Sequence, residues 1–219
     1  MTELSRKERE RLAREQTIIG AAERIFRERG FDETSMDDIA SLAEFTKRTV
    51  YQYFASKEDL YYAVVLKGFR QVDAFMREYM KTACTGYEKL EALITGLYSF
   101  YRDNPEVFLL ISRWSLVKRK HGGDTPIRPS IDEFNVALFK QIETIFTEGA
   151  ADGTIQSDLS PSESACGVVF LVISFMSHFA ITGENFVKFQ HIDRDRFCMN
   201  TLGLILKPFN AARKGGTTA

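Results

Sequence analysis

The chain has 219 residues and a mass of 25.0 kDa, of which hydrophobic residues make up 44% and charged residues 27%. These proportions exclude a disordered tail and a bundle of membrane helices, and the length allows one large domain or two smaller ones. Lys and Arg number 29 and Asp and Glu number 30, which leaves a formal net charge of −1. A strongly basic protein that binds nucleic acid through bulk charge is therefore excluded, whereas a local basic patch is not.

The cysteines, Cys84, Cys166 and Cys198, are too few and too far apart for a disulfide framework or a paired-cysteine metal site. An odd number of free thiols fits a reducing compartment. The chain opens with charged residues and has no apolar stretch behind them, which argues against a secretory signal. We therefore expect a cytoplasmic protein that needs neither a metal nor a cofactor.

One segment, residues 165–182, contains no Asp, Glu, Lys or Arg. Its length is near the lower limit for a helix that crosses a membrane. However, it carries His178 and several hydroxyl residues, and acidic residues flank it at Glu163 and Glu184. A helix that is apolar on nearly all sides can instead be shared between a protein core and a dimer interface. We expect this second arrangement and no membrane partner.

The chain shows helical patterns throughout and almost no strand signals. A first helix is predicted over about 9–29, followed by Gly30, where a left-handed C-terminal cap would suit. Ser35 can cap a short second helix, and Thr46 can cap a third that follows a turn at residues 44–45. A fourth begins at Ser56 and can continue to about residue 79.

Beyond about residue 85 the predicted helices become longer and richer in aromatic residues. The pattern predicts them over 87–103, 106–120, 130–149, 160–183 and 193–207, separated by loops rich in Gly and Pro at 121–129 and 149–161. The expected fold class is therefore all-α, with about nine helices.

The segment 35–57 is the most informative about function, because two short amphipathic helices there are joined by a tight turn. Such a helix-turn-helix places its second helix in the major groove of DNA. Lys47 and Arg48 lie in the first turn of that helix, where they would meet base edges or phosphates. The other candidate contacts are Thr49, Tyr51 and Tyr53, the phosphate-binding Lys57, and a basic arm of Arg6, Lys7, Arg9, Arg11 and Arg14.

The alternative is that these are ordinary solvated helices. Residues 1–59 hold 11 Lys and Arg against 13 Asp and Glu, a net charge of −2, so bulk charge does not support DNA binding. Periodicity alone leaves the two interpretations open.

The N-terminal 60 residues resemble the DNA-binding domain of the TetR/AcrR family of bacterial transcriptional repressors. The matching run is IIGAAERIFRERGFDETSMDDIASLAEFTKRTVYQYFASKEDLYYAVV, in which the opening AERIFRERGFDETSMDDIA and the close TVYQYFASKEDL are most specific. Over residues 60–219 the resemblance rests only on helix number, helix length and loop placement. It implies a helix-turn-helix DNA-binding domain at 1–56 and a ligand-binding and dimerisation domain at 57–213. The Gly-Gly-Thr-Thr composition predicts a mobile tail at 214–219.

The resemblance also implies roles by position. Residues Thr46, Lys47, Arg48, Thr49 and Tyr51 match positions that meet bases and adjoining phosphates, and Ser35, Tyr53 and Lys57 match positions that hold phosphates. Glu44 departs from the pattern, because the family usually has glycine at this turn position. If Glu44 must adopt a left-handed conformation, the strain costs on the order of 1 kcal/mol.

The remaining helices would enclose an apolar effector, although aromatic residues at helical spacing usually belong to the core. Two polar groups within apolar stretches, Arg113 and His178, could hold the polar end of a ligand, and His178 equally fits a helix interface. The apolar candidates are Tyr98, Tyr101, Phe108, Ile111, Trp114, Phe134, Phe139, Phe170 and Phe175.

By resemblance, the last two long helices pair with those of a second copy as a four-helix bundle. The expected function is a homodimeric, ligand-responsive repressor that binds a palindromic double-stranded DNA operator and is released by a small, largely apolar effector. Two alternatives remain: a helical adaptor that uses the helix-turn-helix for protein contacts, and a small-molecule enzyme. No phosphate-binding loop, nucleophile elbow or metal-ligand spacing supports an enzyme.

Overall fold

The computed structural model describes residues 5–122 and 124–214, which are helical apart from short turns and loops. Within these ranges there is no β-strand, and Ile155 and Asn210 form an isolated antiparallel bridge. The fold class is all-α, as predicted. The helices are α1 (Arg6–Arg29), α2 (Met36–Leu42), α3 (Lys47–Tyr51), α4 (Lys57–Met80), α5 (Gly86–Asp103), α6 (Pro105–Ser112), α7 (Trp114–His121), α8 (Arg128–Ala151), α9 (Pro161–Gln190), α10 (Arg194–Leu206), the 3-10 turn η1 (Lys207–Phe209) and α11 (Ala211–Lys214).

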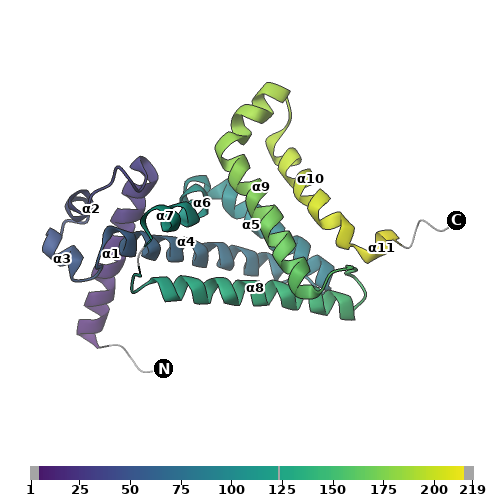
Figure 1. The fold of residues 1–219 in the computed structure, drawn as a ribbon, viewed down its shortest axis with the longest axis horizontal. Coiled ribbons are helices and arrows are strands. Elements are labelled where there is room, and N and C mark those ends of the chain that lie inside the picture. Colours follow the sequence, from purple (N-terminus) through teal and green to yellow (C-terminus); the bar gives the residue numbers. More distant parts are fainter. Residues whose placement is uncertain (1–4, 123, 215–219) are drawn as a thin grey trace. The chain divides into compact units, whose positions relative to one another are not determined.

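Figure 1 labels these helices along the chain. The described chain divides into two compact units. Unit 1 holds the residues up to Phe69 and the segment Arg113–Asp132, and unit 2 holds Arg70–Ser112 and the residues from Glu133 onward. The helices α4 and α8 therefore contribute residues to both units. The functional division at residues 56 and 57 stays a prediction. The tail expected over 214–219 lies outside the described residues from 215 onward, and Lys214 ends α11.

Local signals fix both ends of α1. Ser5 and Glu8 form a capping box that starts the helix at Arg6, three residues before the predicted start. At the other end Gly30 has φ 80° and ψ 176°. The positive φ agrees with the expected glycine cap, but ψ is extended, and this combination is essentially accessible only to glycine. The chain can therefore leave α1 at Gly30 in a direction that other residues would resist.

The core of unit 1 lies on one face of α1. Ile18 and Ala22 are fully buried there, as are Ile39 of α2 and Val50 of α3. The start of α4 is held by Asp59, whose buried carboxylate accepts hydrogen bonds from the backbone N–H groups of Ala55 and Ile127, each at 3.2 Å. The first turn of α4 is thereby tied to the loop before α8.

The helix predicted over 106–120 is two helices, α6 and α7. The chain turns at Arg113, which has φ −88° and ψ −4°, and the Ser112 hydroxyl donates to the Leu109 carbonyl at 2.9 Å. Val107 and Phe108 are among the buried residues of α6, whereas α7 buries none. The break separates a helix that belongs to unit 2 from one that belongs to unit 1, so tertiary packing overrides the continuous helical pattern.

Unit 2 contains a close crossing of α5 and α8. A Cβ atom added at Gly86 would lie 2.2 Å from the Cα atom of Gly149, so the two glycines let the helices approach each other. The carboxylate of Asp152 accepts the backbone N–H of Gly86 at 2.8 Å. At the far end of the unit, α9 runs to Gln190, seven residues beyond its predicted end, and stops at His191 in the left-handed conformation.

Candidate nucleic-acid interface

A tight turn joins α2 and α3 in the predicted helix-turn-helix. The backbone N–H of Phe45 donates to the Ala40 carbonyl at 2.9 Å, and Glu44 has φ 57°. This left-handed conformation is strained for a residue with a Cβ atom. The turn position therefore has the backbone geometry that glycine would satisfy without strain.

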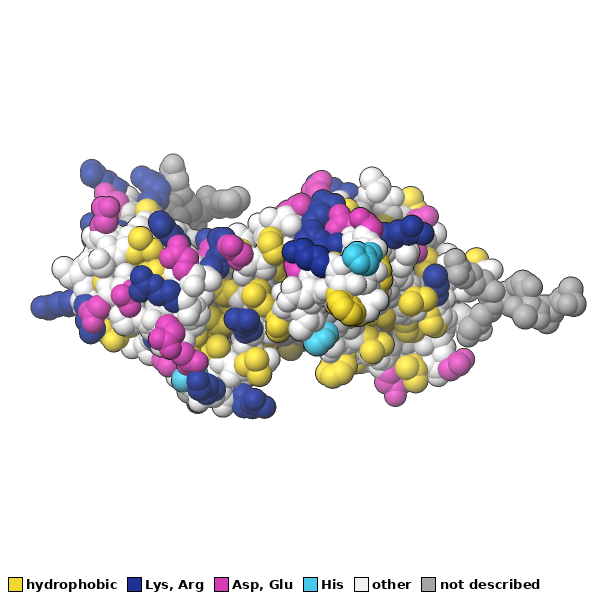
Figure 2. All heavy atoms as spheres, turned by 90° about the horizontal axis from the view of Figure 1, so that it is seen from above, with side chains coloured by type: hydrophobic (Ala, Val, Ile, Leu, Met, Phe, Trp, Pro, Cys, Tyr) yellow, Lys and Arg dark blue, Asp and Glu magenta, His cyan; other side chains and the backbone are white. Residues whose placement is uncertain are grey.

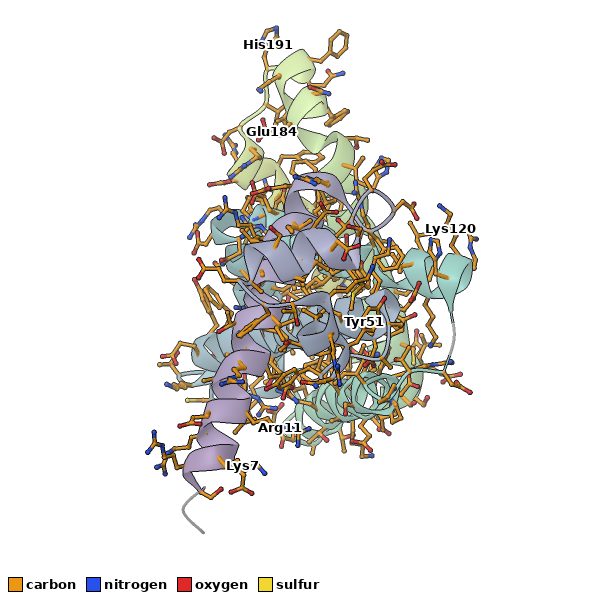
Figure 3. All side chains as sticks on the ribbon, turned by 90° about the vertical axis from the view of Figure 1, so that its left-hand side faces the viewer. Lys7, Arg11, Tyr51, Lys120, Glu184 and His191 are labelled. Carbon is orange, nitrogen blue, oxygen red and sulfur yellow. The ribbon has the colours of Figure 1, made fainter. Side chains whose placement is uncertain are left out.

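The third helix has one side in the core and one side in solvent. Thr46 is its N-cap and accepts the N–H of Thr49 at 3.1 Å, and the two hydroxyl groups lie 2.8 Å apart. Val50 is fully buried, whereas Lys47, Arg48 and Tyr51 are exposed (Figure 3 labels Tyr51). A helix that is anchored by Val50 and presents polar groups outward can enter a groove without unfolding its own core.

The two cations of α3 have different surroundings. The Lys47 ammonium forms a 2.7 Å ion pair with Asp37 on α2, and this hydrogen bond raises the pKa of Lys47 above its ordinary value. The Arg48 guanidinium makes no hydrogen bond or ion pair with any other described residue. Arg48 is thus the α3 cation that can contact DNA without giving up an existing partner. Asp37 was not anticipated from the sequence, because its partner lies ten residues away in another helix.

The three residues expected to hold phosphates also have structural roles. The Ser35 hydroxyl caps α2 by accepting the N–H of Asp38 at 3.1 Å, and Tyr53 is half-buried just after α3. The Lys57 ammonium donates to the carbonyls of Phe31 and Thr34, each at 2.8 Å, and lies 4.3 Å from the centre of the Phe31 ring. A phosphate contact by Lys57 would need one of these bonds to be exchanged, and its DNA role stays a prediction.

Unit 1 includes a second contact that the sequence did not indicate. Asp32, in the loop after α1, pairs with Lys120 and His121 at the end of α7, at 2.8 Å each. The His121 ring lies 4.9 Å from the Phe31 ring, measured between centroids. Lys120, through its hydrogen bond, is the main cause of a lowered Asp32 pKa. The segment after α6 is thereby fastened to the loop between α1 and α2.

Side chains of both signs are interspersed over α1–α3, as the space-filling view shows (Figure 2). This agrees with the count of 11 basic against 13 acidic residues over 1–59. Any attraction of this unit to DNA must therefore come from the placement of individual cations and not from its total charge.

Four of the ligand candidates meet in one aromatic cluster of unit 2. The rings of Tyr98 and Phe108 both contact Tyr101, with centroid distances of 6.1 and 5.3 Å. Phe179 lies 6.4 Å from Tyr101 and connects it to Phe175. The ring of Phe197 lies 5.8 Å from that of Phe179. The sequence did not indicate Phe179 or Phe197, because helical spacing does not reveal which rings on different helices come together.

Tyr98 also forms a polar contact at the edge of this cluster. Its hydroxyl donates to Asp195 of α10 at 2.7 Å. Burial, followed by this hydrogen bond to a carboxylate, raises the pKa of Tyr98, so the phenol stays protonated. The contact joins α5 to the start of α10 within unit 2.

The other ligand candidates are spread over several helices. Ile111 is buried on α6, Phe134 is half-buried and Phe139 exposed on α8, and Phe170 and His178 are exposed on α9. Arg113 and Trp114 belong to unit 1, where the Trp114 ring meets Phe69 at 6.1 Å. Contact with a ligand stays a prediction for all of these residues.

An exposed apolar stripe runs along α9. Phe170, Leu171, Ile181 and Phe189 are 74%, 54%, 60% and 80% exposed. Among the described residues, α9 is the one helix that by length and composition could cross a membrane, with a mean hydropathy of 2.0 in a window that is 28% buried. Gly167, Ser174 and His178 lie on the same side, which is a mixture typical of a face that packs against another helix.

The described residues contain no cluster of three or more His, Cys, Asp or Glu side chains suited to a metal ion.

Comparisons with known proteins find similarity to bacterial regulators. Residues 18–64 match the family model "Bacterial regulatory proteins, tetR family". The chain is 32% identical over 98 residues to the HTH-type transcriptional activator FasR of Mycolicibacterium smegmatis, covering 45% of this chain and 44% of that protein. It is 27% identical over 142 residues to the fatty acid metabolism regulator protein of Bacillus subtilis, covering 65% and 71% of the two chains. The chain therefore spans less than half the length of the first relative.

Solved structures with the same fold cover nearly the whole chain. FadR from Bacillus subtilis in complex with stearoyl-CoA superimposes with a TM-score of 0.70 at 22% identity, over 88% of this chain and 98% of that one. The fatty acid degradation regulator FadR from Bacillus halodurans gives a TM-score of 0.67 at 18% identity, over 87% and 97%. At these identities the likeness concerns the fold.

Proposed function

We propose that the chain is a repressor of the tetR family of bacterial regulatory proteins, whose model matches residues 18–64, and that it binds a palindromic operator as a homodimer. The observation that carries the proposal is α3, which is anchored by the fully buried Val50 and directs Lys47, Arg48 and Tyr51 outward. Two such helices about 34–36 Å apart would reach successive major grooves on one face of a duplex.

A homodimer is proposed because the apolar stripe on α9 needs a partner surface. A second copy offers the same stripe, so a two-fold arrangement would cover both at once. The mixture of small and large side chains along the stripe suits helix packing, and the polar Ser174 and His178 suit a helix interface better than lipid. We propose a cytoplasmic regulator for the same reason, because a dimer interface would cover the apolar stripe on α9 without lipid.

The test of DNA binding is a footprint of the purified protein on the DNA that flanks its own gene, followed by titration of variants. Arg48→Ala should cost roughly 1–3 kcal/mol of operator affinity, concentrated at one base position. Lys47→Ala should cost less, because Lys47 must first leave Asp37. If the wild-type protein leaves no footprint and does not discriminate between sequences, the helix-turn-helix serves protein contacts and the adaptor alternative stands.

For the effector we propose a molecule with a long acyl chain. Two findings support this: the core of unit 2 is rich in aromatic and aliphatic residues, and a relative at 27% identity is named for fatty acid metabolism. The ligand would act by binding preferentially to a form of the dimer in which the two α3 helices do not fit adjacent grooves.

The effector proposal is tested with stearoyl-CoA, and coenzyme A alone serves as the control. We expect stearoyl-CoA to raise the melting temperature and to release the operator, while coenzyme A does neither. Stabilisation without any change in DNA affinity would contradict the regulatory role of the ligand, and the absence of both effects would contradict the ligand class.

A further inference from the structure

The first turns of α1 extend beyond the core of unit 1. Residues 5–14 are all exposed, and the first buried residue of the helix is Ile18. The capping box of Ser5 and Glu8 caps the N-terminus of this helix, with the Ser5 N–H donating to the Glu8 carboxylate at 2.8 Å. The twelve residues before Ile18 form a helical extension of about 18 Å at the usual rise per residue.

The extension carries a stripe of cations on one side, which we call the basic stripe: Lys7, Arg11 and Arg14. Their spacing of four and three residues places them on one face of the helix. None of the three side chains forms a hydrogen bond or ion pair with another described residue, whereas the Arg6 side chain, on another face, is paired with Glu10 at 2.8 Å. The stripe is thus a row of uncompensated charges, and like charges at this spacing weaken a helix.

The direction of the basic stripe follows from the rest of α1. Ile18 lies four residues after Arg14, and Ile18, Ala22 and Ile25 continue the same face into the core. The basic stripe therefore faces the side of α1 on which the rest of unit 1 packs. In Figure 3, Lys7 and Arg11 leave α1 on the side where Tyr51 of α3 lies. Cations and recognition helix belong to the same unit and share one side of α1.

We propose that the basic stripe is a second DNA-binding site, which holds the phosphates of the duplex next to the base pairs contacted by α3. The inference rests on the proposed DNA-binding function and extends it to DNA outside the operator. Phosphates are the anions that a row of exposed cations beside a groove-reading helix would meet, and binding would remove the repulsion along the stripe. An extension of about 18 Å spans about five base pairs at 3.4 Å each.

The test compares two triple variants with equal loss of charge. K7Q/R11Q/R14Q removes the basic stripe, and R24Q/K81Q/K140Q removes three exposed cations outside the extension, each of which pairs with a nearby glutamate. Glutamine keeps helix propensity, and circular dichroism and melting temperatures check the fold of both. For the stripe variant we expect roughly tenfold weaker operator binding at 0.1 M salt. We also expect the slope of log affinity against log salt concentration to be shallower by about two to three per protomer. Equal changes in both variants would show an effect of net charge only and overturn the proposal.

A second measurement uses DNA length. Wild-type protein should bind an operator duplex more tightly when six base pairs of arbitrary sequence are added at each end, and K7Q/R11Q/R14Q should lose this gain. Arg48→Ala should keep the gain while it loses discrimination between operator and scrambled sequence. If wild-type protein discriminates but gains nothing from the added DNA, the basic stripe proposal fails alone. If wild-type protein does not discriminate between operator and scrambled sequence, the proposed DNA-binding function is itself contradicted.

Discussion

Exposed side chains have opposite meanings in α3 and in α9. Around the buried Val50, α3 exposes Lys47 and Arg48. Water solvates these cations well, and a polyanion can displace that water when it binds. In contrast, α9 exposes Phe170 and Phe189, which gain free energy only when another apolar surface covers them. The first surface is suited to a partner that comes and goes, and the second to one that stays.

The strongest test of this contrast is a charge placed on the α9 stripe. Phe170→Asp should weaken the dimer by about 3 kcal/mol, roughly a hundredfold in dissociation constant, because an unpaired carboxylate would be buried in the interface. The matched control is Val136→Asp on α8, which is 70% exposed and lies outside the stripe. Sedimentation equilibrium measures both. If both variants remain equally dimeric, the stripe is not the interface.

The next test concerns the cation that helps to hold the helix-turn-helix together. Lys57→Met should lower the free energy of unfolding by about 2 kcal/mol, because it leaves the carbonyls of Phe31 and Thr34 without their charged donor. Lys140→Met removes an exposed lysine whose partner is Glu143 on the same helix, and should change little. Urea unfolding compares the two variants. Equal stability of both variants would mean that Lys57 does not stabilise the fold, which would leave phosphate binding as its role.

A smaller effect of opposite sign is expected at the turn. Glu44→Gly should raise the free energy of unfolding by up to about 1 kcal/mol, because glycine adopts φ 57° without strain but loses more chain entropy on folding. Glu33→Gly, at a loop position where φ is not positive, should destabilise the protein. A drop in melting temperature for the first variant would contradict the left-handed strain at Glu44.

The smallest effect concerns acid stability. The folded state lowers the pKa of Asp32, chiefly through Lys120, so its contribution is complete above the ordinary carboxyl pKa of about 3.9 and is lost as the pH falls through the lowered value. Asp32→Asn should therefore reduce the melting temperature slightly near pH 6, and this deficit should shrink as the pH falls below about 3.9. Asp158→Asn serves as the control. A deficit that persists unchanged at pH 3 would assign the loss to something other than this charge.

The sequence predicted the helix-turn-helix well, because caps and turns are local. Ser35, Thr46 and the strained Glu44 act through bonds within a few residues, which a pattern can reveal. The break at Arg113 could not be predicted in this way, because it arises where the chain passes from one packed unit to the other. For the same reason Asp37 and Asp32 were missed as partners of Lys47 and Lys120, since both pairs depend on how distant segments meet.

The passage of residues 113–132 through unit 1 has a consequence for hybrid regulators. Unit 1, which holds the proposed DNA-binding helix, is not one contiguous piece of sequence. Lys120 and His121 bind Asp32, and the N–H of Ile127 donates to Asp59. A chimera that grafts only the N-terminal residues onto another sensor would leave these groups behind. A chimera that keeps the native stability of unit 1 has to include both of its stretches, the residues up to Phe69 and Arg113–Asp132.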